Sequence, residues 1–386
     1  MIRIGCIGGG QLLMLMALDS RRKALPFEFI ALDPSKECPA RPYLAEFIQG
    51  DFKDQWKIRE LASKADILTY ELEFTNSDAL QLLTLKLPIH PSPSTLKTIQ
   101  NKYTQAKFLR DHKIDVPDFE FVDDANSIKT ALNLFGYPLM LKACYDSYDG
   151  IGNFLVKEDD EIEEALRYFG GKKLMAQEFI PFDKEISVIA SKNTQGEIRL
   201  FPVAENIHLN NILRTTIVSN RLDDKTKAKA QDLAYRVMDA FQGAGTFGIE
   251  MFARDGEVSI NEIAPRVHNS GHYTLDACET SQFEQHLRAI SGMSLGSTEM
   301  NCDIAIMHNI LGGMNGYTGR FKFEGLEELS TMPGVSFYDY GKREISSKRL
   351  RKLGHATFKY NNVISLDNAL KDSLSAMQRI KIKEAA

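Results

Sequence analysis

Residues 258–274 read VSINEIAPRVHNSGHYT, and the interpretation of the whole chain starts from this stretch. Its first residues have the apolar and β-branched composition of a strand, and the apolar run leads to a carboxylate, Glu262. Polar side chains that can bind anions and move protons follow: Arg266, His268, Asn269 and His272. The stretch therefore predicts a strand that carries charged residues into a binding site.

The strand is expected to form a hairpin with residues 245–253, which have a similar apolar pattern and carry Glu250. Asp255-Gly256 lies between the two segments and is a turn signal. Two carboxylates on one face, beside cationic side chains, would suit Mg²⁺ bound to substrate phosphates. A solvent-exposed hairpin with hydrated glutamates is the alternative.

The length of the hairpin loop decides whether the two carboxylates share a face. A two-residue loop would pair Glu250 with Asn261 and turn Glu262 to the opposite face. A three-residue loop would pair Glu250 with Ile260 and Gly248 with Glu262, so that both carboxylates face the same way. We predict the three-residue loop and a shared face.

The chain has 386 residues, which is enough for about two or three domains. Its 43% hydrophobic and 26% charged residues are typical of a folded globular protein. With a formal net charge of −5 it has no overall positive field for nucleic acid, so any anion site must be local. Nucleic acid is therefore not an expected partner.

The cysteines have no CxxC spacing, which argues against a zinc site or a disulfide framework and indicates a reducing compartment. The first residues resemble a strand and not a signal peptide, and no apolar run is long enough to span a bilayer. We therefore expect a cytoplasmic protein without a membrane segment.

The N-terminal residues predict the start of a parallel α/β domain. An apolar strand at 2–7 is followed by Gly8-Gly9-Gly10 and a helical segment at 11–20, an arrangement in which a backbone can approach a phosphate. Asp33 ends the next apolar run where the ribose-binding acid of a dinucleotide site belongs. Leu13 stands where the third glycine of that motif would be, so we favour a βαβ unit without a dinucleotide.

A strand at 66–70 delivers Glu71 and Glu73 to its C-terminal end, the edge of an open parallel sheet where ligands bind. Hydrated, non-functional carboxylates are the alternative. The proline-rich residues 90–94 mark the first domain boundary, and one helix is expected at 95–112.

A hairpin with a long loop is expected in the next domain. Strands at 138–142 and 154–156 flank residues 145–153, which are rich in small and turn-forming residues. Such a loop can close over a nucleotide with its backbone N–H groups on phosphates, although its composition alone favours an ordinary mobile hairpin.

Two charged segments follow in the C-terminal half. The helix expected at 281–290 carries Glu284, His286 and Arg288, which we expect to face solvent. From about residue 301 short strands and glycines alternate, and a basic cluster follows: Lys342, Arg343, Lys348, Arg349, Arg351 and Lys352. This cluster is either a solvated surface or a dedicated phosphate site.

At residues 261–274, NEIAPRVHNSGHYT resembles the signature motif of the N5-carboxyaminoimidazole ribonucleotide synthetases, ATP-grasp carboxylases of purine biosynthesis. Shorter matches to this family occur in order along the chain: GGGQL at 8–12, LDP at 32–34, TYELE at 69–73, TQAKF at 104–108, YDGIG at 148–152, ENIH at 205–208, ILRTT at 212–216 and RKLGH at 351–355. Their order makes the resemblance persuasive although each match is short.

The resemblance implies a mixed α/β and α+β architecture with the ATP-grasp fold. A nucleotide-binding-like parallel α/β domain is expected at 1–93, and an ATP-grasp domain at 94–295 would include a mobile subdomain at about 115–177. A small β-rich domain is expected at 296–386. The resemblance also implies homodimers.

The resemblance further implies a site, residue by residue. The ATP site would comprise Lys102, Lys142, Ser147, Tyr148, Asp149, Gly150, Ile151, Gly152, Asn153, Glu178, Phe179, Ile180, Pro181, Glu185, His208, Asn261 and Glu262. Mg²⁺, with Mn²⁺ as a substitute, would bind Glu250 and Glu262. Aminoimidazole ribonucleotide (AIR) and its phosphate would contact Glu73, Tyr148, Asp149, Lys342 and Arg349.

The implied reaction is ATP-dependent carboxylation of AIR by bicarbonate, which gives N5-carboxyaminoimidazole ribonucleotide, ADP and phosphate. Arg266 and His268 would form a cationic pocket for bicarbonate and for the carboxyphosphate made from it. The nearest alternative is a formate-dependent glycinamide ribonucleotide transformylase of the same fold. A nicotinamide-dependent oxidoreductase and a non-catalytic nucleotide sensor are alternatives from other classes.

Overall fold

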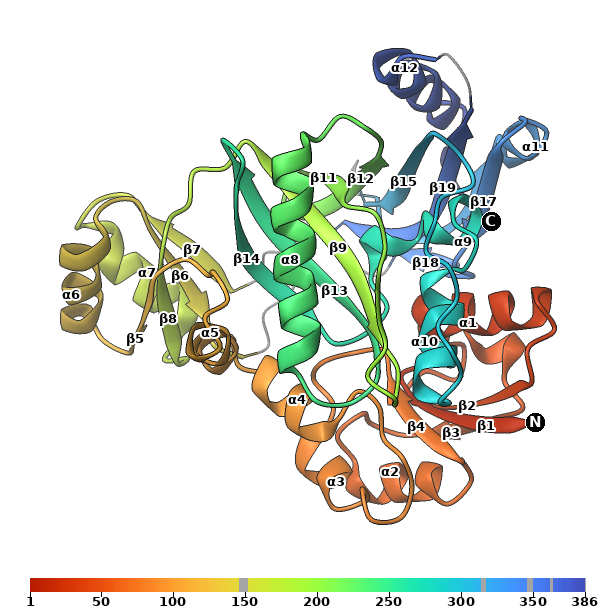
Figure 1. Cartoon of the computed structure of the whole chain (residues 1–386), viewed down its shortest axis with the longest axis horizontal. Coiled ribbons are helices and arrows are strands. Elements are labelled where there is room, and N and C mark those ends of the chain that lie inside the picture. Colours follow the sequence, from red (N-terminus) through yellow and green to blue (C-terminus); the bar gives the residue numbers. More distant parts are fainter. Residues whose placement is uncertain (146–151, 314–316, 346–349, 362–363, 386) are drawn as a thin grey trace.

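Four β-sheets form the framework of the described chain (Figure 1). The computed structural model describes residues 1–145, 152–313, 317–345, 350–361 and 364–385. Most of the loop expected to close over a nucleotide therefore lies outside the described residues. None of the described helices combines the length and the apolar content needed to cross a membrane.

The N-terminal part folds around a parallel sheet in the order β3-β2-β1-β4. Strands β1 and β2 are largely apolar because helices cover both faces of this sheet. Its elements are β1 (Ile2–Ile7), α1 (Gln11–Arg22), β2 (Phe27–Asp33), η1 (Arg41–Tyr43), β3 (Glu46–Gln49), α2 (Gln55–Ala62), β4 (Ile67–Tyr70) and α3 (Ser77–Gln81). The predicted βαβ start is confirmed, since β1 and β2 pair in parallel.

The glycine turn after β1 is filled by carboxylates of the chain itself. The Gly10 and Leu13 N–H groups at the start of α1 donate to the two oxygens of Glu71, the second at 2.9 Å. The Gly9 N–H donates to Asp33 at 2.9 Å. Glu71 thus stabilises the positive end of α1, where a dinucleotide phosphate would otherwise bind. The two acids have internal roles, which counts against the dinucleotide interpretation.

Two helices replace the single helix expected at 95–112. The first, α4 (Pro93–Ile99), ends before Asn101, whose side chain accepts hydrogen bonds from two N–H groups of the following turn. This cap starts a new helix, α5 (Lys102–Asp111). Lys102 consequently lies in the first turn of α5.

An antiparallel sheet in the order β5-β8-β6-β7 forms the subdomain at the left of Figure 1. A buried apolar cluster holds two helices against this sheet. Its elements are β5 (Phe119–Val122), α6 (Ala125–Phe135), β6 (Leu139–Ala143), β7 (Asn153–Val156), α7 (Glu161–Phe169) and β8 (Leu174–Glu178). The pairing of Lys142 with Asn153 confirms the predicted hairpin around residues 145–153.

The largest sheet has the order β14-β13-β9-β11-β12-β15-β19-β17, with β10 paired to the end of β9. Alternate residues of β9, β13 and β14 are apolar and pack against α8, which lies across one face (Figure 1). These elements are β9 (Lys184–Lys192), β10 (Ile198–Leu200), β11 (Ala204–Leu209), β12 (Ile212–Val218), α8 (Asp224–Ala240), β13 (Gly245–Arg254) and β14 (Glu257–Ala264). The opposite face carries polar side chains such as Ser187 and Glu250, together with apolar ones such as Ile189, which packs into a separate buried cluster.

The C-terminal segment extends this sheet, because β15 pairs with β12 and is followed by β19 and β17. The sheet is thus continuous across residue 296, where a separate domain is expected to begin. After η2 (Asn269–Gly271), α9 (Thr274–Ala277) and α10 (Gln282–Ile290), the elements are β15 (Ile304–Gly312), β16 (Gly319–Glu324), α11 (Leu326–Ser330), β17 (Val335–Asp339), β18 (Glu344–Ile345), β19 (Arg351–Tyr360), α12 (Leu366–Met377) and β20 (Lys381–Glu384). Strands β18, β16 and β20 form a small separate sheet.

Helix α10 is buried, contrary to the expectation that its charged residues face solvent. Glu284 and His286 are only 6% and 1% exposed. Glu284 is paired with Lys23, which directly follows α1, and with Arg288. His286 accepts a hydrogen bond from the Thr246 N–H at 3.1 Å. The expectation fails because α10 packs between the N-terminal part and the central sheet, where partners from both satisfy its polar groups.

We predict that Gly8→Ala lowers the midpoint of thermal unfolding far more than Gly170→Ala does. Both glycines have a positive φ, 105° and 58°, which costs an alanine about 1–2 kcal/mol. At Gly8 an added Cβ would also overlap Glu71, which adds about 1–3 kcal/mol, whereas nothing lies within 4 Å at Gly170. Equal midpoints in differential scanning calorimetry would contradict the packing of Glu71 into the turn.

Candidate active site

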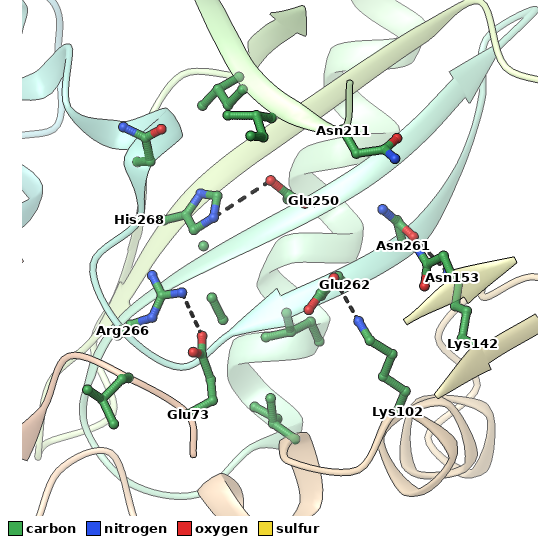
Figure 2. Close-up of a pocket in the computed structure, with 18 of the residues that line it drawn as sticks. Glu73, Lys102, Lys142, Asn153, Asn211, Glu250, Asn261, Glu262, Arg266 and His268 are labelled. Atoms are coloured by element: carbon green, nitrogen blue, oxygen red, sulfur yellow. Dashed lines mark hydrogen bonds and ion pairs between the residues drawn. The ribbon is translucent and has the colours of Figure 1, made fainter. Parts of the chain in front are cut away.

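A cleft of about 1480 Å³ lies where the N-terminal part, the subdomain, the central sheet and the C-terminal segment meet (Figure 2). This volume exceeds the roughly 300–1,000 Å³ of a site for one small ligand. Its charged and polar lining includes Glu73, Lys102, Lys142, Glu178, Glu185, His208, Glu250, Asn261, Glu262, Arg266, His268, Lys342, Arg351 and Lys352. The cleft therefore has room for two substrates.

A β-bulge in the hairpin of β13 and β14 brings the two carboxylates together. The loop is the two-residue turn Asp255-Gly256, with φ of 51° and 77°, so the predicted three-residue loop is wrong. The bulge at Asn261 shifts the register, and Glu250 pairs directly with Glu262 and not with Ile260. Because cross-strand partners share a face, the predicted shared face is found, but for a different reason.

The polar face of the central sheet aligns the expected nucleotide-binding residues. Glu250 on β13 pairs with Ser187 on β9, and Glu185 on β9 pairs with Asn206 on β11. His208 lies two residues after Asn206 and therefore on the same face. Together these side chains form one polar surface on the side of the sheet opposite α8.

Two lysines reach this surface from the facing elements (Figure 2). Lys102 Nζ lies 2.9 Å from Glu262 Oε2, and Lys142 Nζ donates to Asn261 Oδ1 at 3.1 Å. Burial and the positive charge of Lys102 lower the pKa of Lys142 to about 7. An anion between the two lysines would relieve their repulsion, so the pair is suited to phosphate.

The paired carboxylates repel each other. Burial and the negative charge of Glu262 raise the pKa of Glu250 to about 7. Burial also opposes ionisation of Glu262, but Lys102 and Lys142 hold its pKa below 4.5. A proton or a metal cation beside Glu250 is therefore favoured.

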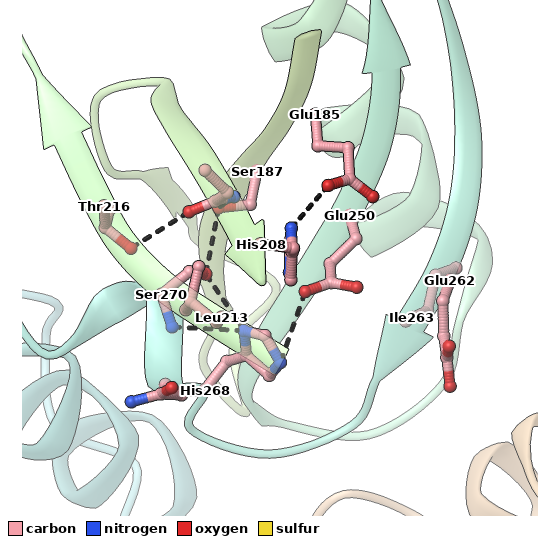
Figure 3. A network of polar contacts seen from close by, with 12 residues as sticks. Glu185, Ser187, His208, Leu213, Thr216, Glu250, Glu262, Ile263, His268 and Ser270 are labelled. Carbon is pink, nitrogen blue, oxygen red and sulfur yellow. Dashed lines mark hydrogen bonds and ion pairs between the residues drawn. The ribbon is translucent and has the colours of Figure 1, made fainter. Parts of the chain in front are cut away.

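His208 forms an ion pair with Glu185 beside these carboxylates (Figure 3). Burial opposes protonation of its ring, but the negative charges of Glu185 and Glu250 raise its pKa above 6.5. The carboxylate expected to bind a ribose is thereby held in place by a cation.

His268 lies against β13 because Gly248 has no side chain, and a Cβ at that glycine would overlap the histidine. Its Nε2 lies 3.7 Å from Glu250 Oε1 (Figure 3). Burial and the nearby positive charge of Arg266 hold its pKa well below 6.5. Both influences favour the neutral ring of His268 when no ligand is bound.

Arg266 links the N-terminal part to the central sheet. Its Nη2 lies 2.8 Å from Glu73 Oε1, and its Nη1 donates to the Val267 carbonyl at 3.1 Å (Figure 2). Its Nε is buried and has no hydrogen-bond partner within the described parts of the chain. Because buried donors are normally satisfied, this atom is suited to an anionic ligand.

Part of the basic cluster reaches the cleft from the C-terminal segment. Lys342, Arg351 and Lys352 line the cleft, and Lys342 Nζ donates to the Lys352 carbonyl at 2.8 Å. Arg343 instead pairs with an aspartate four residues earlier. Arg349, expected to bind the AIR phosphate, lies outside the described residues.

The remaining residues expected to bind ATP fall into three groups. Four line the cleft: Asn153, Glu178, Phe179 and Ile180. Pro181 is exposed and Gly152 is buried, and neither lines the cleft. The others lie outside the described part of the chain: Ser147, Tyr148, Asp149, Gly150 and Ile151.

Several residues at the cleft are not among the site residues that the sequence predicts. Phe182 and Phe252 stack at the edge of the cleft with ring centres 4.6 Å apart. Ser187 and Asn206 lie beneath it on the polar face of the sheet. The period-two alternation of strands could have indicated both, because they stand two residues from Glu185 and from His208.

Within the described residues no group of three or more His, Cys, Asp or Glu side chains is arranged to hold a metal ion. Glu250 and Glu262 nevertheless fit Mg²⁺, which needs few protein oxygens when phosphates and water complete its octahedron. Their mutual repulsion, seen in the raised pKa of Glu250, is what a cation between them would remove.

Three family models match the chain in order. They are a ribonucleotide synthetase preATP-grasp domain at residues 1–100, an ATP-grasp domain at 107–283 and a phosphoribosylaminoimidazole carboxylase C-terminal domain at 305–368. The fold and the site thus define an ATP-grasp enzyme.

The N5-carboxyaminoimidazole ribonucleotide synthase of Bacillus subtilis is 38% identical over 356 residues, which cover 92% of this chain and 90% of that protein. The chain belongs to the N5-carboxyaminoimidazole ribonucleotide synthase family and is an ATP-dependent C–N ligase, as the sequence predicts. A Schizosaccharomyces pombe relative named phosphoribosylaminoimidazole carboxylase is 39% identical over 92% of this chain, but the chain spans only 64% of that protein.

Two crystal structures of the family share the fold. The Thermotoga maritima N5-carboxyaminoimidazole ribonucleotide synthetase has a TM-score of 0.88 and 38% identity over 100% of both chains. The Aspergillus clavatus synthase, in complex with ADP and 5-aminoimidazole ribonucleotide, has a TM-score of 0.86 and 30% identity over 98% of this chain and 99% of that one. The predicted ATP-grasp fold is confirmed.

We predict that Glu185→Gln lowers the pKa of His208, because it removes the negative charge paired with the ring. NMR titration of the histidine ring C–H groups measures this pKa without nucleotide. In the wild type the ion pair stabilises the fold below pH 6.5, and this contribution is lost as the pH rises through the raised pKa. Glu120→Gln, an exposed residue on β5, is the control. An unchanged His208 pKa in Glu185→Gln would contradict the ion pair.

Proposed function

We propose that the chain carboxylates AIR with bicarbonate and ATP, giving N5-carboxyaminoimidazole ribonucleotide, ADP and phosphate. The observation that carries this proposal is one cleft that combines three kinds of site. Two lysines beside two carboxylates can bind the phosphates of a nucleoside triphosphate and its metal ion. Arg266 and His268 can bind a small anion, and Lys342 can bind the phosphate of a second substrate.

ATP would bind along the polar face of the central sheet. Lys102 and Lys142 would neutralise its phosphates, and Glu185 would accept hydrogen bonds from the ribose hydroxyls once His208 releases it. The apolar surface around Phe179 would receive the adenine. The Aspergillus clavatus synthase has the same fold, and its crystal structure contains ADP and AIR. That complex supports the proposal that this chain binds both ligands.

Mg²⁺ would bind between Glu250 and Glu262, with Asn261 beside them, and Mn²⁺ could replace it. Bound there, the metal would neutralise negative charge on the phosphates during phosphoryl transfer. Lys102, now paired with Glu262, would exchange that partner for a phosphate oxygen.

Bicarbonate is a weak electrophile, so one of its oxygens must first take the γ-phosphoryl group of ATP. The product is the mixed anhydride carboxyphosphate. Arg266 would hold this anion, because its buried Nε lacks a partner in the described parts of the chain. The amine of AIR then attacks the carbonyl carbon, the C–O bond to the phosphate breaks, and the amine loses a proton.

AIR would lie between the N-terminal edge of the cleft and the C-terminal segment. Glu73, held by Arg266 at 2.8 Å, would contact the aminoimidazole end, and Lys342 would contact the phosphate. This arrangement keeps the AIR phosphate away from the ATP phosphates. The contacts proposed for Tyr148, Asp149 and Arg349 involve residues outside the described part of the chain.

A homodimer in the cytoplasm is part of the same proposal. The family resemblance supports the dimer. All five cysteines are free, which agrees with a reducing compartment.

We predict that Glu262→Gln abolishes ATP turnover and leaves the protein folded. The substitution removes a charged metal ligand, while the side chain it replaces is 41% exposed and so contributes little to the core. Phosphate release with ATP, Mg²⁺, bicarbonate and AIR measures turnover, and circular dichroism checks the fold. Glu257→Gln on the same strand is the control, because Glu257 is exposed and pairs with Lys225. Unaltered turnover at saturating Mg²⁺ would remove Glu262 from the metal site.

We also predict that Lys342→Ala raises KM for AIR far more than KM for ATP. A charge-assisted phosphate contact contributes roughly 1.5–3 kcal/mol, so the increase should be on the order of ten-fold or more. Lys322→Ala, an exposed lysine of the same segment, is the control and should change neither constant. Equal effects on both substrates would argue against the phosphate contact. Turnover with formate and glycinamide ribonucleotide would contradict the carboxylase assignment and support the transformylase alternative.

A further inference from the structure

A chain of buried hydrogen bonds ends on His268 (Figure 3). Thr216 Oγ1 donates to Asn206 Oδ1 at 3.0 Å, and Asn206 Nδ2 donates to Ser187 Oγ at 2.8 Å. Ser187 Oγ bonds Ser270 Oγ at 2.9 Å, which lies 2.9 Å from His268 Nδ1. The four residues before the histidine, the relay, are at most 5% exposed. Buried hydroxyls and amides need partners, so these bonds have no replacement in solvent.

The direction of the relay is fixed at its histidine end. The Ser270 N–H lies 3.4 Å from His268 Nδ1 and can only donate, so Nδ1 is an acceptor. The Ser270 hydroxyl then also donates to Nδ1 and accepts from Ser187, which in turn accepts from the Asn206 amide. The Thr216 hydroxyl donates to the Asn206 carbonyl, so every donor points toward the histidine.

We propose that the relay locks His268 as the neutral tautomer with its proton on Nε2, so that the ring is a hydrogen-bond donor to an anion in the cleft. That the anion is bicarbonate or carboxyphosphate rests on the proposed function. Nε2 is the ring atom on the cleft side, 3.7 Å from Glu250 Oε1. Ser270, Ser187 and the rest of the relay touch no substrate and are positioning residues.

A second set of contacts fixes the main chain of His268. Gln282 Oε1 accepts from the His268 N–H at 2.8 Å, and Gln282 Nε2 donates to the His268 carbonyl at 2.7 Å. Ring and backbone are thus oriented before a ligand binds, which is how a preorganised donor stabilises developing charge. A neutral donor also adds no positive charge beside Glu250, where a metal cation would bind.

Ser270→Ala tests the relay, with Ser191→Ala as the matched control. Ser191 is equally buried, lies on the same strand as Ser187, and bonds Thr246 at 2.7 Å outside the relay. Nitrogen-15 NMR of the histidine-labelled full chain reports which ring nitrogen of His268 carries the proton, without any substrate. We expect the proton on Nε2 in the wild type and in Ser191→Ala. Ser270→Ala keeps only the long 3.4 Å contact from the Ser270 N–H to Nδ1 and loses the 2.9 Å contact from the hydroxyl. We therefore expect a detectable fraction of rings with the proton on Nδ1 and a kcat on the order of ten-fold lower, with KM for ATP unchanged.

Two substitutions of the histidine test the donor role. His268→Gln places an amide near the position of Nε2, and His268→Asn places it near Nδ1. We expect the Gln variant to keep on the order of ten-fold more activity than the Asn variant. Equal activities would overturn the donor role.

A proton on Nδ1 in the wild type would overturn the inference, as would a Ser270→Ala variant that matches Ser191→Ala in both tautomer and kcat. If Ser270→Ala does not fold, Thr216→Val at the far end of the relay supports or overturns the inference by the same two readouts. A wild type with the Nε2 proton but without bicarbonate-dependent turnover would refute the proposed function and leave the tautomer assignment intact.

Discussion

The direct pairing of Glu250 with Glu262 across β13 and β14 is the constraint on which the site depends. In an unbroken strand, alternation would turn Asn261 and Glu262 to opposite faces. The bulge turns both toward the cleft and keeps Ile260 and Ile263 in the core beneath α8. One inserted residue thus satisfies the packing of the core and the chemistry of the cleft together.

Without a ligand, most charges around this pairing are held by partners from other elements. Ion pairs join Lys102 to Glu262, His208 to Glu185 and Arg266 to Glu73. These side chains are partly exposed, so each pair can open to a ligand that replaces the lost partner by charge or by hydrogen bonds. Binding of a cation and of phosphates together would satisfy both Glu262 and Lys102. This arrangement of charges agrees with the proposal that a metal and a nucleotide bind together.

The sequence predicted what depends on local pattern. The βαβ start, the ATP-grasp family and the hairpin that carries the carboxylates follow from apolar alternation, turn residues and motif order. Helix α4 was wrongly joined to α5, although Asn101 is a residue type that caps helices. The predicted pairing of Glu250 with Ile260 was also wrong. The loop at Asp255-Gly256 is one residue shorter than predicted, and a bulge that no local sequence signal marks still brings Glu262 to the same face as Glu250.

What remained hidden depends on contacts between distant segments. Glu71 fills the glycine turn, and α10 is buried between two parts of the chain, so the roles of their charged residues follow from tertiary packing. The relay is of the same kind, because Ser187 and Ser270 are 83 positions apart and meet only in the folded chain. A resemblance in motifs identified the family, whereas the protonation of His268 required the positions of its neighbours.

Transfer of ¹⁸O from labelled bicarbonate to inorganic phosphate tests the central claim most directly. If the cleft phosphorylates bicarbonate, the phosphate released during AIR-dependent turnover carries one bicarbonate oxygen, because the C–O bond to that phosphate is the one that breaks. Mass spectrometry of the phosphate should therefore show one ¹⁸O atom per molecule formed. Phosphate without the label, produced at the same rate, would show that bicarbonate is not phosphorylated and would contradict the account.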